Sequence, residues 1–383
     1  MKLSEIAKVK AGNVAPKKGD FDECGVPFVR AGSLTNLLAG GRIADLERIG
    51  VSTARELRLT LFPKGTVVFA KSGMSCMTGN VYVLPEPCYV VSHLACIIPN
   101  GNYAAYLKHY FRFNRPNRLI ENPAFPSIKL SKIQNIELRL PTPQKVEEQV
   151  QSFECIEASI ERTKVQLSHL DSLVKSRFVE MFGDPVINPK GWSTQNLKAL
   201  GELKNGVNFK SVDNGFEIKC LGVSDFKDRY AIKDMSLISD ISLSGKPNVN
   251  QLLQDGDVVF VRSNGNKALV GRCLAIFPGE KKVTFSGFCI RFRNTSEELE
   301  LDYLLNCLKT DSMRKVMTGR GANIQNLSQG LLSKVEIPLP PLELQQEFAA
   351  FASQVDKSRF IAQQQIEKLQ MLYDSLAQDY FGD

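Results

Sequence analysis

Residues 335–383 read VEIPLPPLELQQEFAAFASQVDKSRFIAQQQIEKLQMLYDSLAQDYFGD, and residues 136–184 read IELRLPTPQKVEEQVQSFECIEASIERTKVQLSHLDSLVKSRFVEMFGD. The two stretches align without a gap, and each residue of 335–383 lies 199 positions after its match in 136–184. Their shared pairs are Glu137/Glu336, Leu140/Leu339, Pro141/Pro340, Glu148/Glu347, Ser159/Ser358, Gln166/Gln365, Leu170/Leu369, Leu173/Leu372, Ser176/Ser375 and the closing Phe182-Gly183-Asp184/Phe381-Gly382-Asp383. Such a register identifies a tandem repeat.

Each copy carries a stripe of mainly apolar positions spaced alternately four and three residues apart, the period of a helix that packs against another helix. The two stripes are Ile156, Ile160, Thr163, Leu167, Leu170, Val174, Arg177 and Met181, and Val355, Arg359, Ala362, Ile366, Leu369, Tyr373, Leu376 and Tyr380. Prolines precede each stripe and a glycine follows it, as at helix boundaries. The sequence therefore predicts a helix over Lys145–Phe182, roughly 57 Å long at 1.5 Å per residue, and a matching second one.

A single amphipathic helix usually packs on its own globular domain, but two helices with matching stripes can bury them against each other, and we favour that pairing. The first helix leads into the second globular segment and the second helix leaves it, so the pair should be antiparallel. We predict an α+β fold: two globular α/β domains in tandem, residues 1–135 and 185–334, separated by helical regions 136–184 and 335–383 that pair as an antiparallel coiled coil with pseudo-two-fold symmetry.

Composition is that of an ordinary globular protein, because 383 residues with 43% apolar content can form more than one core. Apolar runs stay far below the ~18 residues of a membrane helix and the N-terminus lacks a signal-peptide profile, so we expect a cytoplasmic protein with no membrane partner. Nine cysteines and three histidines show no metal-ligand spacing. We expect reduced, buried thiols, with Cys96, Cys155 and Cys289 in apolar surroundings, and neither a disulfide framework nor a metal site.

Charge separates the globular segments from the helical regions. Residues 1–135 contain 18 Lys and Arg against 9 Asp and Glu, and residues 185–334 contain 21 against 15. The helical regions are acidic, with 6 against 9 in 136–184 and 3 against 8 in 335–383. Basic domains on acidic helices suggest a phosphate backbone as ligand, although a bias that serves only solubility would give the same numbers.

The globular segments also resemble each other at a few anchor points. A Leu-x-x-Ile-x-x-Val-x-x-Gly pattern at residues 3–12 matches Leu-x-x-Leu-x-x-Leu-x-x-Gly at 197–206, and we read both as short opening helices. KGTVVFAKS at 64–72 matches DGDVVFVRS at 255–263, a turn and strand that end in a basic residue. Loops around 35–58 and 223–249 differ. A shared scaffold with different loops indicates one kind of ligand with two identities.

Together these features resemble the specificity (S) subunit of type I restriction–modification enzymes, in which two target-recognition domains alternate with two conserved helical regions. The resemblance covers essentially the whole chain. It is carried by IPLPPLELQQE at 337–347, by the long helix that ends in YFGD at 380–383, by the weaker first copy from LPTP at 140–143 to FGD at 182–184, and by RGANIQNLS at 320–328. The first domain departs from the last pattern, reading NPAFPSIKLS at 122–131.

The resemblance implies a DNA-recognition subunit without catalytic residues or cofactor. Its expected partners are double-stranded DNA, two adenine-methylating modification subunits and, through the assembled complex, restriction subunits. Consistent with this, the chain has no Gly-rich S-adenosylmethionine loop and no G-x-x-x-x-G-K-[ST] phosphate loop. A bipartite DNA site with an unread spacer is expected, because the stripe from Ile156 to Met181 spans roughly 39 Å, close to the ~34–36 Å of one DNA turn.

Two short motifs suggest catalysis but lack its other parts. Residues 122–125, Asn-Pro-Ala-Phe, are one residue from the Asn-Pro-Pro-Phe loop of adenine methyltransferases, yet no cofactor loop accompanies them. Glu217-Ile218-Lys219 after Asp213 has the spacing of a nuclease metal motif, but alternating charge at a strand edge is the better interpretation.

Candidate DNA contacts are basic and polar side chains at the matching strand ends and on loops, and most should reach phosphates rather than bases. They are Lys71, Ser72, Arg262, Ser263 and Asn264 at the strand ends, and Lys17, Lys18, Arg30, Lys129, Lys210 and Arg320 on loops. Solvated surface lysines and arginines are the alternative explanation for each.

Partner subunits are expected on the exposed acidic face of the helices, which includes Glu147, Glu154, Glu157 and Glu161 in the first copy and Gln363, Gln364, Glu367 and Gln370 in the second. The alternative function for the whole chain is a coiled-coil scaffold whose basic domains bind protein or RNA.

Overall fold

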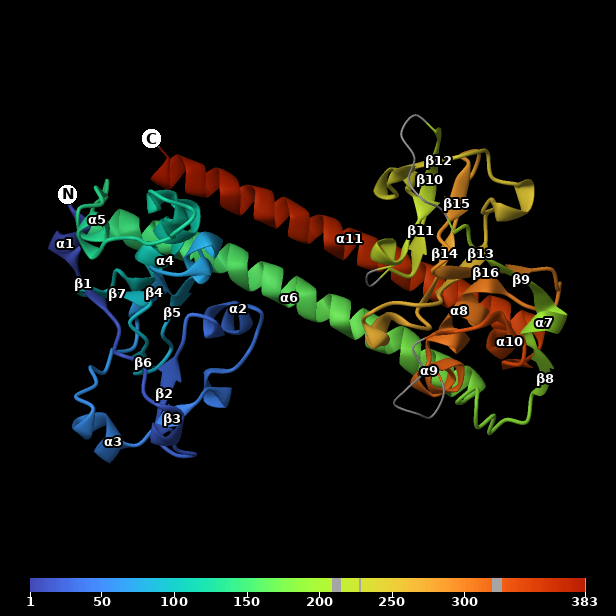
Figure 1. The fold of residues 1–383 in the computed structure, drawn as a ribbon, viewed down its shortest axis with the longest axis horizontal. Coiled ribbons are helices and arrows are strands. Elements are labelled where there is room, and N and C mark those ends of the chain that lie inside the picture. The colour runs from blue at the N-terminus through green and yellow to red at the C-terminus, as the bar shows by residue number, and fades with distance from the viewer. Residues whose placement is uncertain (209–214, 227–228, 319–325, 383) are drawn as a thin grey trace. The chain divides into compact units, whose positions relative to one another are not determined.

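Two compact units make up the chain in the computed structural model, which describes residues 1–208, 215–226, 229–318 and 326–382 (Figure 1). Unit 1 comprises Met1–Lys164 and Gln363–Asp383, and unit 2 comprises Val165–Ala362. Helix α6 (Pro143–Phe182) begins in unit 1 and ends in unit 2, whereas α11 (Leu342–Phe381) begins in unit 2 and ends in unit 1. Each unit is therefore completed by one end of each repeat helix.

Unit 1 is built on two sheets, a four-stranded one in the order β1-β7-β4-β5 and a three-stranded one in the order β3-β2-β6. Its strands are β1 (Ala7–Ala11), β2 (Val26–Val29), β3 (Arg48–Ile49), β4 (Val67–Ala70), β5 (Val81–Val83), β6 (Tyr89–Val90) and β7 (Leu94–Pro99). Its short helices are α1 (Leu3–Ile6), α2 (Ser33–Leu38), α3 (Val51–Glu56), α4 (Ala104–Phe113) and α5 (Leu130–Gln134). Strand β4 is buried throughout and packs with Ile97, Leu107 and Phe111 into one core.

Unit 2 has a five-stranded sheet in the order β11-β14-β13-β16-β9, a three-stranded sheet in the order β12-β10-β15, and the pair β17-β8. Its strands are β8 (Ser193–Asn196), β9 (Gly201–Asn205), β10 (Phe216–Leu221), β11 (Ala231–Ile232), β12 (Asp240–Leu243), β13 (Asp257–Val261), β14 (Cys273–Ile276), β15 (Val283–Phe285), β16 (Cys289–Asn294) and β17 (Glu336–Leu339). Its helices are α7 (Leu197–Leu200), α8 (Leu301–Lys309), α9 (Asp311–Thr318) and α10 (Gln329–Leu332).

The two units share a core strand order, β1-β7-β4-β5 in unit 1 and β9-β16-β13-β14 in unit 2, and unit 2 adds β11 at the edge of this sheet. The glycines that the sequence aligned occupy equivalent places in the two sheets. A Cβ on Gly12 would lie 2.2 Å from the Val91 carbonyl oxygen, and one on Gly206 would lie 2.1 Å from that of Ser286. No other residue allows the chain to leave β1 or β9 so close to the neighbouring strand. Before β4 and β13, Gly65 and Gly256 both have φ +83°, a left-handed turn conformation that glycine adopts without strain.

Within each unit, α6 and α11 pack against each other in opposite directions. In unit 1 the early residue Phe153 of α6 stacks on the late residue Phe381 of α11, with ring centroids 5.7 Å apart. In unit 2 the late residue Phe178 of α6 meets the early residue Phe348 of α11 at 5.5 Å. The predicted α+β organisation, with two α/β units and antiparallel long helices, is confirmed. Every residue of the two predicted stripes is buried or half-buried.

Several element boundaries differ from the sequence-based expectation. Helix α6 begins at Pro143 rather than Lys145, because proline suits the first turn of a helix, where its missing N–H is not needed. The opening segments are one-turn helices followed by strands, so Val9 and Leu203 lie in β1 and β9. Residues 136–142 belong to the globular part of unit 1, since the Leu3 N–H donates to the Ile136 carbonyl and the Leu138 N–H to that of Met1.

Exposure corrects one expectation about the cysteines. Cys155 is exposed on α6, although we expected apolar surroundings, because it lies beside the buried stripe and faces away from it; Cys24 is exposed as well. Cys96 and Cys289 are buried. In the described part of the chain, no helix combines the length and the apolar content that crossing a membrane requires.

Candidate nucleic-acid interface

Lys71 and Arg262 occupy equivalent places at the ends of β4 and β13. The Lys71 N–H donates to the His93 carbonyl at 2.9 Å, and the Arg262 N–H donates to the Phe288 carbonyl at 2.8 Å. On the other side, the carbonyl of Lys71 accepts from Ile128 and that of Arg262 from Leu327, both at 2.7 Å. The backbone of each basic residue is thus hydrogen-bonded on both sides. One partner is the residue directly before β7 or β16, and the other lies in the loop that leads to α5 or α10.

Polar neighbours of the two residues differ between the units. Ser72 Oγ lies 2.8 Å from His93 Nδ1, and Ser72 pairs through its backbone with Ser127. In unit 2, Ser263 pairs with Asn326, and Asn264 accepts the N–H of Asn266 at 2.7 Å. The Arg262 guanidinium donates to the Gly287 carbonyl at 3.4 Å, and a guanidinium has five N–H donors in all. One backbone arrangement therefore presents two different sets of hydrogen-bonding side chains.

Exposed apolar side chains beside these residues were missed by the sequence analysis. Phe288 has 62% of its surface exposed and lies next to Arg262 through the backbone hydrogen bond; its equivalent in unit 1 is the exposed His93. Phe125 and Met74 are 81% and 74% exposed, and their loops meet where the Gly73 N–H donates to the Pro126 carbonyl. Apolar side chains beside basic ones suit thymine methyl groups or unstacked bases. An aromatic residue between a glycine and a strand was the available signal for Phe288.

Two further basic residues extend the unit 1 surface. Arg115 and Arg118 are exposed at the 3-10 helix η4 (Pro116–Leu119). That helix packs on η3 (Met74–Thr78), where Asn117 Nδ2 donates to the Met77 carbonyl at 3.0 Å. Lys129 is exposed one residue after Ile128, which binds Lys71. We define the unit 1 candidate surface as Lys71, Ser72, Met74, His93, Arg115, Arg118, Phe125 and Lys129.

The remaining predicted residues are not all brought to this surface. Lys17 and Lys18 are exposed, but no hydrogen bond or ion pair in the described residues connects them with the Lys71 group. Arg30 donates to Glu47 at 2.6 Å and lies over the Phe21 ring at 5.0 Å, contacts that give it a structural role. Lys210 and Arg320 lie outside the described residues.

Of the two short motifs that suggest catalysis, Asn122–Phe125 and Glu217–Lys219 lie within the described residues, whereas Asp213 lies outside them. Lys219 pairs with Asp240 on the neighbouring strand at 3.1 Å, as alternating charge on paired strands predicts. Within the described residues, no three or more His, Cys, Asp or Glu side chains form a group that could hold a metal ion.

Comparison with known proteins places this arrangement in a family. The family model described as the type I restriction modification DNA specificity domain matches residues 1–169 and 189–371. The chain belongs to the family of type I restriction–modification specificity subunits. The resemblance inferred from the repeat is thereby confirmed, and each matched range of this specificity subunit covers one globular domain and most of the helix after it.

Individual relatives extend over nearly the full length. The StySPI specificity subunit of Salmonella potsdam is 23% identical and covers 92% of this chain and 80% of its own. The MjaIX specificity subunit of Methanocaldococcus jannaschii is 21% identical, and the alignment covers 98% of this chain and 90% of that protein. Among solved structures, the S subunit from M. genitalium superposes with a TM-score of 0.53 at 12% identity, over 100% of this chain and 96% of the other. A second solved structure, described as the structural basis of complex assembly and conformational transition of the type I R-M system, superposes with a TM-score of 0.59 at 18% identity. The superposition covers 100% of this chain and 96% of the other.

The acidic helix face needs one correction. Glu154 and Glu161 are exposed as expected, but Glu157 is half-buried. It accepts a hydrogen bond from Lys108 at 2.5 Å and another from Arg112, both on α4. Burial is the largest single influence on the pKa of Glu157 and raises it. The hydrogen bond from Lys108 and the nearby positive charges together outweigh burial, so the pKa of Glu157 lies below its usual value. Glu157 therefore joins α6 to the globular part of unit 1 and is not available to a partner.

Substitutions at the equivalent strand ends should separate charge contacts from apolar ones. We expect Lys71→Ala and Arg262→Ala each to weaken DNA binding and to lower the slope of log K against log salt by about one, because one phosphate contact is lost. Phe288→Ala should weaken binding with the slope unchanged. Fluorescence anisotropy of labelled duplex at several salt concentrations measures both quantities, and wild-type affinity in all three variants would remove these residues from the interface.

Proposed function

We propose that this specificity subunit reads an asymmetric, bipartite DNA site, with one half-site bound by each unit, and that it recruits modification subunits and, through them, restriction subunits. The chain itself then performs no catalysis. The methylation and ATP-dependent cleavage would be carried by the partner subunits.

The observation that carries this proposal is the matched pair of strand ends. Lys71 and Arg262 make equivalent backbone hydrogen bonds, but the residues that accept them carry different exposed side chains, His93 in unit 1 and Phe288 in unit 2. Equivalent basic residues support phosphate binding of the same geometry in both units. Different exposed neighbours support different base preferences, and hence two unlike half-sites.

Recruitment is supported by the contrast between the helices and the domains. The helical regions align without a gap over 49 residues and share 12 identical pairs, whereas the loops of the domains differ in both sequence and length. Surfaces that bind copies of the same partner are expected to stay alike, while surfaces that read different bases are expected to differ. Glu154 and Glu161 are exposed on the first of these helices and remain candidates for a partner contact. They match Ser353 and Phe360 in the second copy, so a contact made through them would belong to the first helix alone.

Exchange of one unit tests the bipartite reading. Residues 1–142 should be replaced by the matching segment of another specificity subunit, with the junction before Pro143 because residues 136 and 138 pair with the N-terminal segment. We expect only one half of the methylated motif to change when the hybrid is co-produced with its modification subunit and methylated sites are sequenced.

Replacing residues 185–341 is the reciprocal control and should alter the other half-site. A change in both halves after one exchange would contradict independent reading by the two units. Binding of RNA or of an unrelated protein, with no sequence-specific DNA binding by the assembled complex, would favour the scaffold function instead.

A further inference from the structure

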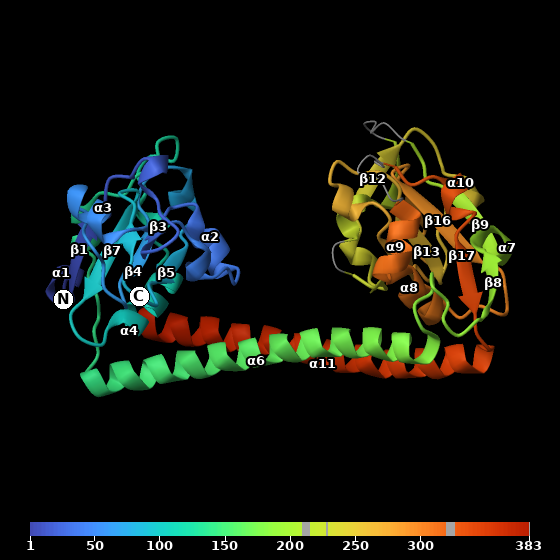
Figure 2. The same ribbon diagram turned by 90° about the horizontal axis from the view of Figure 1, so that it is seen from below.

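Two apolar side chains of the unit 1 candidate surface, Phe125 and Met74, lie in water rather than in the core. Phe125 is 81% exposed and Met74 is 74% exposed. Their loops meet just beyond the end of β4, which lies between β7 and β5 in the sheet (Figure 2), because the Gly73 N–H donates to the Pro126 carbonyl at 3.0 Å. Exposed apolar groups rimmed by polar residues mark sites that bind another molecule.

The loop that carries Phe125 is braced by its own hydrogen bonds. Asn122 Oδ1 accepts from the Ala124 N–H at 3.0 Å, and the Asn122 carbonyl accepts from the Phe125 N–H at 3.2 Å. Pro123 takes the second position of this turn, where the fixed φ of proline is favourable. Three residues after Phe125, the chain enters the core at Ile128, which is 2% exposed. An aromatic ring on such a support loses little conformational freedom when it binds.

Positive charge surrounds the apolar pair. The three segments that form this part of the surface, residues 71–80, 114–120 and 122–131, contain no aspartate or glutamate, and their basic residues are Lys71, Arg115, Arg118 and Lys129. The acidic residue nearest to them in the sequence, Glu121, pairs with Lys132 at 2.5 Å. An apolar pair with a cationic rim is complementary to duplex DNA, whose charge lies on its phosphates and whose apolar surface lies between its stacked bases.

We propose that Phe125 inserts between two base pairs of the half-site read by unit 1, with Met74 against the same step, a role that rests on the proposed reading of DNA by that unit. Phenylalanine and methionine are among the side chains that proteins insert between base pairs, where they partly unstack and kink the duplex. The basic residues of the rim bind the phosphates on either side of the opened step.

Insertion gives Phe125 a part in sequence specificity that a phosphate contact does not have. Pyrimidine–purine steps unstack and kink more easily than other steps, so the half-site of unit 1 contains or adjoins such a step. Lys71 positions the duplex but carries no sequence information directly. The segment of unit 2 that matches residues 122–125 in sequence is 321–324, which lies outside the described residues, so the proposal concerns unit 1 alone.

Substitution of Phe125 in the complex assembled with its modification subunits tests this role. Phe125→Ala should weaken binding to a duplex with the methylated motif by roughly tenfold, the order expected for the loss of stacking on one base, while the slope of log K against log salt stays unchanged. Phe125→Leu keeps an apolar wedge and should recover most of the affinity. Val51→Ala is the matched control, because Val51 is a 59% exposed apolar residue of the same unit at the start of α3, and it should bind like the wild type.

Fluorescence of 2-aminopurine, an adenine analogue that brightens when it is unstacked, reports the insertion directly. The analogue is placed in turn along the unit 1 half-site, away from the methylated base, because a target adenine flipped by a modification subunit gives a signal of its own. We expect the wild type to raise the fluorescence severalfold at one step. Phe125→Ala should lose this increase, whereas Phe125→Leu and Val51→Ala should keep it.

Wild-type affinity in Phe125→Ala would overturn the proposal. Weaker binding with an undiminished fluorescence increase would overturn it as well, because the ring would then contact the duplex from outside the base stack. Weaker assembly of Phe125→Ala with the modification subunit in the absence of DNA, measured by native mass spectrometry, would show that a protein surface is the occupant. Failure of the wild-type complex to bind any specific duplex would instead contradict the proposed function.

Discussion

Asp257→Ala is expected to lower the free energy of unfolding of unit 2 by about 3–5 kcal/mol, the range for removing one partner of a buried ion pair. Asp257 is only 1% exposed at the start of β13. Its carboxylate accepts from Arg293 Nε at 2.8 Å and Nη2 at 2.7 Å, and from the Gln254 N–H at 2.7 Å. The neighbouring Arg291 is 2% exposed, and burial followed by repulsion from Arg293 lowers its pKa. Without Asp257, two guanidinium groups would lie close together without their main counter-charge.

Urea unfolding followed by a probe in unit 2 measures this loss. Asp240→Ala is the matched control, because Asp240 also pairs with a basic residue, Lys219, but its side chain is 60% exposed. Exposed pairs contribute about 0–1 kcal/mol. A loss of less than about 1 kcal/mol in Asp257→Ala would contradict the assignment, and Asp257→Ala combined with Arg293→Met should recover part of the stability.

Acid should destabilise unit 1 through His109. Burial, followed by repulsion from Lys108, lowers the pKa of His109 to about 4, and the opposing attraction of Glu157 does not restore it. In the unfolded chain the pKa returns to 6.5. Between these values the unfolded chain binds a proton that the folded unit does not, so stability falls as pH falls. We expect a loss of about 2 kcal/mol between pH 7 and pH 5, approaching about 3 kcal/mol at lower pH.

His109→Asn provides the test, since asparagine stands at the equivalent position in unit 2 as Asn306. The variant should show a flatter dependence of unfolding free energy on pH between 7 and 5, although its stability at pH 7 is lower. His93→Asn, which replaces an exposed histidine of the same unit, should keep the wild-type dependence. An equal pH dependence in wild type and His109→Asn would show that other groups cause the acid effect.

The sequence alone predicted those features that repeat along the chain. The 199-residue register, the four-and-three spacing and the Val-Val-Phe strands each depend on local periodicity, which survives in a single sequence. The equivalence of Lys71 and Arg262 followed from the same pattern. Gly12 and Gly206 marked the close approach of two backbones that the structure then located.

Features that depend on packing between distant elements were not predictable in this way. Glu157 follows Ile156 of the apolar stripe and looked solvent-exposed, because the sequence does not show that α4 packs on that face of α6. Arg30 resembled a free loop arginine, yet Glu47 from another strand end neutralises it. A cleft of about 470 Å³ in unit 2 is lined by Val174 of α6 and Ala352 of α11, which lie far apart in the sequence, and no local pattern connects their volumes.

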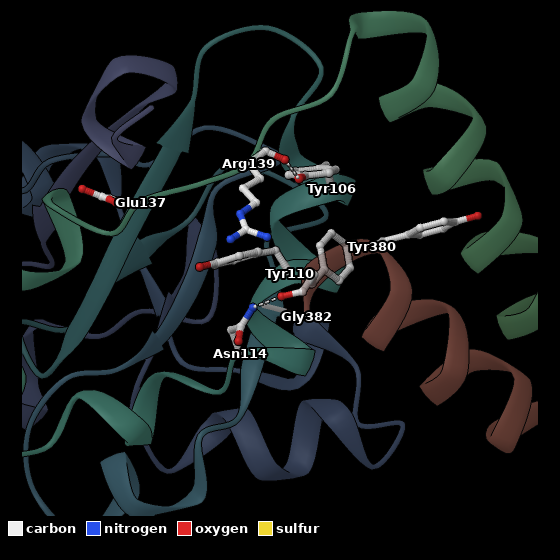
Figure 3. Close-up of a pocket in the computed structure, with 8 residues that line it drawn as sticks. Tyr106, Tyr110, Asn114, Glu137, Arg139, Tyr380 and Gly382 are labelled. Carbon is white, nitrogen blue, oxygen red and sulfur yellow. Dashed lines mark hydrogen bonds between the residues drawn. The ribbon is translucent and has the colours of Figure 1, made fainter.

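The C-terminal end of α11 has a consequence for the order in which the protein is finished during synthesis. Phe381 packs against Tyr106 and Tyr110 with centroids 5.4 and 5.8 Å apart, and its carbonyl accepts from Asn114, 267 positions earlier. Phe381 and these three residues help to line a small cavity of about 110 Å³. Figure 3 shows the Arg139 side chain pointing toward Tyr110 at this site.

A ribosome completes all of Val165–Ala362 before it supplies this helix end. At 5–20 residues per second, unit 1 waits roughly 10–40 s for its last helical segment, with Phe153 and His109 uncovered in the meantime. Unit 2 has all of its residues by then. Unit 1 is thus begun first and completed last, and loss of the end of α11 would remove Phe381 from its packing in unit 1.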